Sequence, residues 1–148
     1  MVEDRCRGCN GELAYAAGLF DGEGSIMLRP RRPRNNGTLI VSMSNTDAAL
    51  IAWMKERWGG FAKPYRMQGN RKPAWSWCLA ARAAARFLSA IQPYVVSPRN
   101  KQRIRLALDF QASKSLSHAE LRSPEYATWV DARLVDMAAL NRRGLPSE

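Results

Sequence analysis

The stretch LAYAAGLFDGEGS at positions 13–25 constrains the fold of this chain more than any other. Its first half consists of small and apolar residues, and a helix of this composition lets another backbone approach closely because no large side chain keeps it away. Its second half contains two carboxylates, Asp21 and Glu23, each followed by glycine. Glycine after a helix permits the left-handed cap that ends the helix. We therefore expect a helix at about 12–21, with Glu23 just beyond its end and close to whatever packs against it.

The composition fits one compact domain with a basic surface. The chain has 148 residues, of which 46% are hydrophobic, and its formal net charge is +10. This length suffices to bury a core. We expect a flexible lead-in over 1–10, a single domain over 11–142 and a tail over 143–148. A strongly basic chain is typical of proteins that bind a polyanion, with nucleic acid as the leading candidate and an acidic membrane surface as the second.

Several classes of protein fit the sequence poorly. No stretch approaches the length of a membrane-spanning helix, and the N-terminus does not have the form of a signal peptide. We therefore expect an intracellular, soluble protein without a membrane partner. Three cysteines form an odd number and predict no disulfide framework. Cys6 and Cys9 have a zinc-like spacing, but no second Cys pair exists and the only histidine is His118, so we assign them no metal.

The order of hydrophobic patterns predicts an α+β fold. Residues 25–32 alternate between apolar and exposed positions, and an Asn-Gly turn separates them from a second strand at 38–44. A second hairpin is expected at 61–67 and 73–79. Helical periods occur at Leu50–Trp58, Ala84–Ile91, Ile104–Gln111 and Tyr126–Leu140. The order is therefore helix, hairpin, helix, hairpin and further helices, with an antiparallel sheet of four strands.

Residues 16–24, AAGLFDGEG, closely resemble the signature of the LAGLIDADG homing endonucleases. The match retains the order Gly, Leu, Asp, Gly, acid, Gly. Further similar residues fall at 59–60, 92–94 and 123–131. The resemblance implies helices that back a curved four-stranded sheet, whose open face lies in the major groove of DNA. It also implies a site-specific endonuclease that cuts both strands of a long, pseudo-palindromic site, as intron or intein endonucleases do.

Phosphodiester hydrolysis requires an activated water and charge stabilisation on the scissile phosphate. Mg²⁺ prefers oxygen ligands and keeps several waters. Glu23 can supply a carboxylate and Gly22 a backbone carbonyl, and in the family the final acid of the motif is the metal ligand. The resemblance implies Mg²⁺ as the cofactor, with Mn²⁺ able to substitute and Ca²⁺ supporting binding without cleavage.

Three further residues are candidates for the catalytic site. Asn45 matches a family position that orders water near the metal, although it also suits a helix cap. Arg99 falls where the family carries a lysine beside the phosphate. Aligning this segment needs an inserted residue around 97–98, so Lys101 is a rival for that role. As an alternative, either side chain contacts only the phosphate backbone.

The chain carries one motif, whereas breaking a duplex requires two cuts. We therefore expect a homodimer with one Glu23 near each scissile phosphate. Ala14, Ala17 and Gly18 are expected at its interface. By resemblance, Asp21 stabilises the helix ends at the dimer axis and holds no metal. The alternative is that the small residues pack inside a monomer.

DNA recognition is expected on the outer faces of the strands and at the hairpin tips, where arginine can reach guanine edges. No small-molecule substrate is expected. The face of the third strand stays open at this point. The predicted DNA-binding residues are Arg29, Arg31, Arg32, Arg34, Asn35, Asn36, Ser42, Lys63, Arg66, Arg71, Lys72 and Ser76.

A second function uses the same fold without cleavage, as an RNA maturase or a transcription regulator. Loss of the motif acid would favour this alternative, and the sequence retains Glu23. A basic structural domain would leave the motif unexplained.

Overall fold

The structure is a computed structural model, and it describes residues 10–33, 35–65, 69 and 72–142. The expected lead-in and tail lie outside these residues, except that Asn10 begins the first helix. The strands are β1 (Gly24–Arg29), β2 (Thr38–Asn45), β3 (Phe61–Tyr65) and β4 (Ala74–Ala80). The helices are α1 (Asn10–Glu23), α2 (Ala48–Trp58), α3 (Ala81–Ile91), α4 (Pro98–Ala112), α5 (His118–Leu121) and α6 (Pro124–Asn141), with short 3₁₀ turns at Gln92–Tyr94 and Ser113–Ser115.

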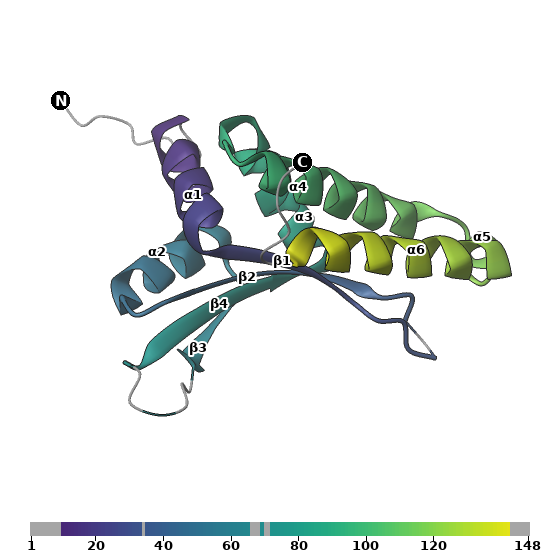
Figure 1. The fold of residues 1–148 in the computed structure, drawn as a ribbon, viewed down its shortest axis with the longest axis horizontal. Helices are drawn as coiled ribbons and strands as arrows, with labels where there is room; N and C mark the ends of the chain where they lie inside the picture. Colours follow the sequence, from purple (N-terminus) through teal and green to yellow (C-terminus); the bar gives the residue numbers. More distant parts are fainter. Residues whose placement is uncertain (1–9, 34, 66–68, 70–71, 143–148) are drawn as a thin grey trace.

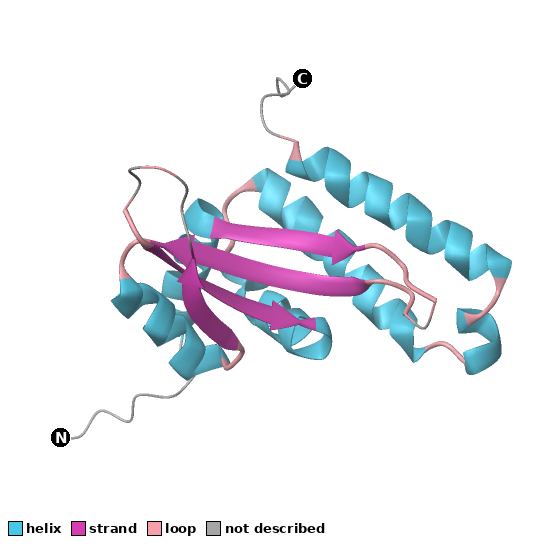
Figure 2. Ribbon diagram, turned by 90° about the horizontal axis from the view of Figure 1, so that it is seen from below, coloured by secondary structure: helices cyan, strands magenta, loops and turns pink. Residues whose placement is uncertain are grey.

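The four strands form one antiparallel sheet in the order β1-β2-β4-β3. Ile26 lies opposite Val41, which in turn lies opposite Leu79, so these three side chains share one face. The helices gather on that face (Figure 1). Seen from the other side, the sheet lies in front of the helices and its face is open (Figure 2). The predicted α+β architecture, with a four-stranded antiparallel sheet backed by helices, is confirmed.

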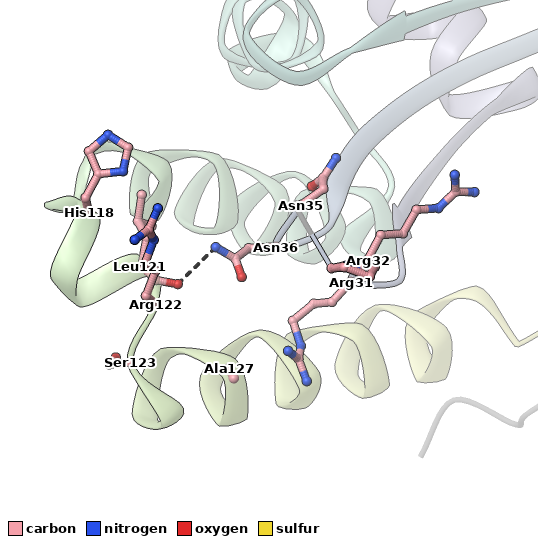
Figure 3. A pocket seen from close by; sticks show the side chains of 10 residues that line it. Arg31, Arg32, Asn35, Asn36, His118, Leu121, Arg122, Ser123 and Ala127 are labelled. Atoms are coloured by element: carbon pink, nitrogen blue, oxygen red, sulfur yellow. Dashed lines mark hydrogen bonds between the residues drawn. The ribbon is translucent and has the colours of Figure 1, made fainter.

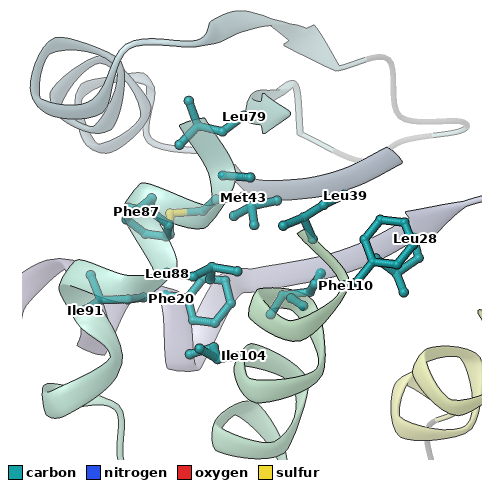
Figure 4. Close-up of a cluster of buried hydrophobic side chains, with 14 of the residues drawn as sticks. Phe20, Leu28, Leu39, Met43, Leu79, Phe87, Leu88, Ile91, Ile104 and Phe110 are labelled. Atoms are coloured by element: carbon teal, nitrogen blue, oxygen red, sulfur yellow. The ribbon is translucent and has the colours of Figure 1, made fainter. Parts of the chain in front are cut away.

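The core lies between the sheet and the helices (Figure 4), and Phe87 of α3 is fully buried in it. Its ring meets those of Phe20, Trp58 and Trp77 edge-to-face, with centroid distances of 5.9, 5.0 and 5.3 Å. Such aromatic pairs contribute about 0.5–1.5 kcal/mol each beyond the burial of their area. Through these contacts, α1, α2 and β4 all pack against the ring of Phe87, and the end of α1 is held against the sheet.

The junction between α1 and β1 differs from the prediction. The helix extends to Glu23, and the strand begins at the next residue. The expected left-handed cap is wrong, because neither Gly22 nor Gly24 has a positive φ. Gly24 is required for a different reason: a Cβ there would lie 2.6 Å from the Phe20 carbonyl oxygen and would overlap the Phe20 ring. The chain therefore passes directly from helix to strand, with Glu23 as the last helical residue.

The C-terminal helices extend the core beside β1. Phe110 of α4 stacks with Trp129 of α6 at a centroid distance of 6.5 Å, and Trp129 stacks with Tyr126 at 5.8 Å. The buried face of α4 includes Phe110 and not, as the period suggested, Gln111. Among the described residues, no helix combines the length and the apolar character needed to cross a bilayer.

Candidate active site and nucleic-acid interface

Glu23 lies at a pocket of about 610 Å³ where the end of α1, the start of β1 and the start of α4 meet. The Glu23 side chain is exposed, and within the described residues it forms no ion pair. We call this the Glu23 pocket. Its lining residues are Asp21, Gly22, Glu23, Gly24, Ser25, Met27, Ser97, Arg99, Asn100, Arg103 and Asn141.

Asp21 joins the end of α1 to the start of α4. Its carboxylate accepts hydrogen bonds from the backbone N–H groups of Val96 at 2.8 Å and Ser97 at 3.4 Å. It also accepts one from Nδ2 of Asn100, a buried residue, at 2.9 Å. Ser97 then caps α4 by accepting from the Asn100 N–H at 3.3 Å. The two neighbouring acids therefore differ: Asp21 accepts hydrogen bonds from within the chain, whereas Glu23 has no partner in the part of the chain that the structure describes and is available to a ligand.

The structure separates the two rival cations of α4. Arg99, in the first turn, lines the Glu23 pocket, whereas Lys101 is exposed and does not line it. Asn45 also lies outside this pocket lining. Its Oδ1 accepts the N–H of Asp47 at 2.8 Å, and Asp47 in turn caps α2 by accepting from Ala49. Asn45 thus stabilises the turn before α2, whose N-cap is Asp47.

Arg103 and Asn141 are among the residues of the Glu23 pocket that were not predicted as site residues. Arg103 lies one helical turn beyond Arg99, and this i, i+4 spacing could have predicted it. Burial and the nearby charge of Arg99 both lower the pKa of Arg103. Asn141, at the end of α6, donates from Nδ2 to the carbonyl of Ile26 at 2.9 Å. No local pattern could have placed Asn141 here, because its contact joins residues more than a hundred positions apart.

The oxygen donors at the Glu23 pocket fit a hard divalent cation. Within the described ranges, no three His, Cys, Asp or Glu side chains come together as a complete protein-made metal site. A carboxylate from Glu23 and a backbone carbonyl from Gly22 suit Mg²⁺ or Ca²⁺, which accept water and phosphate oxygens as their other ligands. Softer metals are bound through cysteine thiolate or imidazole donors, and the pocket lining contains neither; its one sulfur atom is the thioether of Met27.

Within the four strands as the structure describes them, the open face of the sheet carries charge only at two distant places. Arg29 and Lys63 are the only charged side chains in the four strands, and the register places Lys63 beside Ser76 on this face. The face of the third strand, which the sequence left open, is thereby settled. Between the two cations lie Met27, which is 45% exposed, and Phe61, which is 77% exposed. Ser42 is also on this face, opposite Cys78 and Ser25.

The tip of the β1–β2 hairpin is held against the C-terminal helices (Figure 3). Arg31 points toward α6 and pairs with both carboxylate oxygens of Asp131, at 2.9 and 3.0 Å. This pairing raises the pKa of Arg31 and lowers that of Asp131. Asn36 donates to the carbonyl of Leu121 at 3.0 Å. The expected place of Arg31 on the strand face is wrong, because β1 ends at Arg29 and its alternation does not continue. The predicted contact of Arg31 with DNA stays a prediction.

Of the other residues predicted at the hairpin tips, three lie within the described residues and three lie outside them. Arg32 is exposed and extends away from α6, while Asn35 donates to Thr38 Oγ1 at 3.0 Å (Figure 3). Lys72 is exposed before β4. Arg34, Arg66 and Arg71 lie outside the described residues.

Comparison with known proteins links this geometry to one fold. No family model matches the sequence, and no curated protein matches it. Among solved structures, the homing endonuclease I-CvuI bound to its target has a TM-score of 0.71 and 15% identity, over 90% of this chain and 83% of that one. The archaeal intron-encoded I-Vdi141I, complexed with DNA, has a TM-score of 0.73 and 12% identity, over 94% and 89%. The LAGLIDADG endonuclease I-GzeII has a TM-score of 0.63 and 15% identity. The match covers 90% of this chain and 46% of I-GzeII. The chain has the fold of the LAGLIDADG homing endonucleases.

Within the LAGLIDADG fold, the motif helix α1 presents a face of small residues to solvent. Ala14, Gly18 and Gly22 are exposed along it, and Tyr15 beside them is 48% exposed. Ala17, three residues after Ala14, lies at the border of this face and is fully buried in the core of the single chain. The expectation that Ala17 contacts a second copy is therefore wrong, whereas Ala14 and Gly18 are accessible to one.

Proposed function

We propose that this protein is a site-specific, metal-dependent endonuclease that cuts double-stranded DNA. The observation that carries the proposal is the Glu23 pocket. There, an exposed carboxylate, which has no ion-pair partner among the described residues, lines the pocket together with the cation of Arg99. Two of the lining residues, Ser25 and Met27, belong to the open face of the sheet, so DNA on that face reaches the pocket with its backbone.

Glu23 and the Gly22 carbonyl would hold the divalent cation. When bound, Mg²⁺ supplies an activated water and neutralises charge on the scissile phosphate. Arg99 stabilises the charge that develops on the phosphate, because a preorganised donor needs no reorganisation during the reaction. We expect Mn²⁺ to replace Mg²⁺, and Ca²⁺ to support binding without cleavage. The structures of I-CvuI with DNA were obtained in the presence of Ca or Mg.

The open face of the sheet would read the base edges in the major groove. Arg29 can donate to guanine in a bidentate manner, a contact that contributes about 1–3 kcal/mol of discrimination. Met27 and Phe61 present apolar surface that suits the methyl group of thymine. Lys63 and Arg32 extend this face, and the remaining predicted contacts are Arg31, Arg34, Asn35, Asn36, Ser42, Arg66, Arg71, Lys72 and Ser76.

A homodimer would supply the second active site. One Glu23 serves one strand, and a two-fold axis at α1 would place a second Glu23 near the other strand. The exposed positions Ala14 and Gly18 support this arrangement, because small side chains let two helices approach closely. Asp21 would stabilise the helix ends near that axis through its hydrogen bonds to the segment that leads into α4.

The experiment is a cleavage selection on a randomised duplex library in Mg²⁺, with the wild type beside Glu23→Gln. We expect the wild type to enrich one cut site with approximate two-fold symmetry, and the variant to enrich none. If neither protein cuts and both retain a common sequence, the fold serves binding alone. That outcome would favour an RNA maturase or a transcription regulator.

A further inference from the structure

The Glu23 pocket contains a second arginine, Arg103, that the motif does not explain. Arg99 and Arg103 lie one turn apart on α4 and line the same pocket. Neither forms an ion pair or a side-chain hydrogen bond within the described part of the chain. Arg31, Arg57 and Arg133 differ, because each pairs with a carboxylate.

The surroundings of Arg103 favour an anionic ligand. Its Nε atom is buried without a hydrogen-bond partner, and both burial and the charge of Arg99 lower its pKa. An arginine nevertheless stays protonated at neutral pH. A partly buried cation beside a like charge is destabilised unless an anion accompanies it. Within the described residues, no carboxylate pairs with Arg99 or Arg103, so a bound anion would supply the compensating charge.

The shape and position of the Glu23 pocket identify the class of this anion. A guanidinium presents a fork of donors that matches two oxygens of a phosphate, and two such groups can hold one phosphate from two sides. The pocket reaches the open face through Ser25 and Met27. A nucleic-acid backbone that crosses this face therefore passes the two arginines.

We propose that Arg103 and Arg99 together bind one backbone phosphate of duplex DNA in the Glu23 pocket. This phosphate clamp rests on the proposed function in that duplex DNA is the partner. Arg99 supplies the exposed half of the clamp, and Arg103 supplies the half that is already partly withdrawn from water. The clamp places the backbone beside Glu23, so Arg103 is a phosphate-binding residue in addition to the family positions.

The test compares Arg103→Met with Arg105→Met. Arg105 is exposed on the same helix, so both variants lose one positive charge and only one of them loses a pocket residue. The probe is a pool of 30-base-pair duplexes of random sequence in Ca²⁺, with binding measured by fluorescence anisotropy over a range of salt concentrations. Each lost phosphate contact reduces the slope of log K against log salt by about 0.9. Because Arg99 stays on the same phosphate, we expect a reduction of up to this size, per chain, for Arg103→Met, and less than half of the Arg103→Met reduction for Arg105→Met.

Two controls separate a phosphate contact from a structural role. Arg103→Lys retains the charge, and we expect it to restore most of the salt slope. Thermal unfolding checks the fold of each variant, and Arg103→Gln replaces Arg103→Met if the latter does not fold. Equal slopes for the folded Arg103 and Arg105 variants would overturn the clamp.

Cleavage separates the clamp from the proposed function. On a cut site found by selection, we expect Arg103→Met to cut at least tenfold more slowly than Arg105→Met. If both cut at the wild-type rate with equal salt slopes, the clamp is wrong and the endonuclease stands. If the wild type never cuts but the two salt slopes differ as expected, the clamp stands and the endonuclease is wrong.

Discussion

The hairpin tip and the Glu23 pocket both contain arginine, but the arginines have different partners. At the tip, Arg31 pairs with Asp131 of α6, and Lys114 donates to the carbonyls of Asn36 and Gly37 at 3.0 and 2.9 Å. At the pocket, Arg99 and Arg103 have no carboxylate partner within the described residues. A neutralised cation fixes one part of the fold against another, whereas an unpaired cation is available to a ligand. Whether an arginine stabilises the fold or is available to a ligand therefore depends on whether a carboxylate pairs with it.

The largest effect on the pocket side of this comparison is expected for Gly24→Ala. The added Cβ would lie 2.6 Å from the Phe20 carbonyl oxygen, and backbone at the α1–β1 junction must move. Overpacking of this kind costs about 1–3 kcal/mol, occasionally more, in the free energy of unfolding. Urea denaturation measures the loss.

Gly22→Ala is the matched control for Gly24→Ala. A Cβ at Gly22 meets nothing within 4 Å, and alanine favours a helix over glycine by about 1 kcal/mol. Its carbonyl is retained for the cation. We expect unchanged or increased stability, and equal losses in both variants would contradict the account of this junction.

Asp21→Ala should have the next largest effect, because it removes the connection that positions α4 at the Glu23 pocket. The substitution leaves Nδ2 of the buried Asn100 without its partner, and an unsatisfied buried donor costs about 1–3 kcal/mol. We expect lower stability by urea denaturation together with slower cleavage. Asp21→Asn retains an acceptor and should lose less; if it loses as much, the hydrogen bonds are not the cause.

Lys114→Met should loosen the hairpin tip without changing the Glu23 pocket. It removes two bonds to backbone carbonyls and a cation–π contact with Phe110, whose ring centroid is 4.7 Å from Nζ. The net contribution of a hydrogen bond to a charged group is about 1.5–3 kcal/mol and that of an exposed cation–π contact about 0.5–1 kcal/mol. Because contacts of one group do not add in full, we expect a loss of about 2 kcal/mol. Hydrogen exchange at the tip measures this, and faster exchange at Asp21 instead would contradict the separation of the two regions.

The smallest effect is expected for Arg31→Ala, because both partners of its ion pair are exposed. Pairing lowers the pKa of the Asp131 carboxyl. Its contribution to stability is therefore present above the ordinary carboxyl pKa of about 3.9 and is lost as the pH falls through the lowered value. We expect a small difference in Tm between wild type and variant at pH 7 that disappears in acid. A difference that grows in acid would contradict this sign.

The local patterns of the sequence predicted the order of elements, both hairpins and the α+β class. They worked because each amphipathic segment buries one face against the same core, as Ile26 and Leu28 do in β1. They failed where tertiary contacts decide. Ala17 and Ala14 are alike in sequence, yet only the packing of α1 buries the first and exposes the second.

The Glu23 pocket was predicted in part for the same reason. A motif places Glu23, and helical spacing from Arg99 could have placed Arg103. The ion pair of Arg31 with Asp131 and the bond of Asn141 to Ile26 cross a hundred residues or more, and no local pattern contains them. Pro30 partly predicts the end of β1 at Arg29, because proline cannot donate a hydrogen bond to a neighbouring strand.

The most direct test of the central claim is cleavage of the selected duplex under single-turnover conditions by wild type and Glu23→Gln in Mg²⁺. Glu125→Gln, which removes an exposed acid in the first turn of α6, is the matched control. We predict that Glu23→Gln loses at least 1,000-fold in rate, on the order of 4 kcal/mol of transition-state stabilisation, while Glu125→Gln cuts normally and all three proteins bind the duplex in Ca²⁺ with similar affinity. Cleavage by Glu23→Gln at the wild-type rate, or equal loss of binding and cleavage, would contradict the claim that the carboxylate of Glu23 holds the catalytic metal.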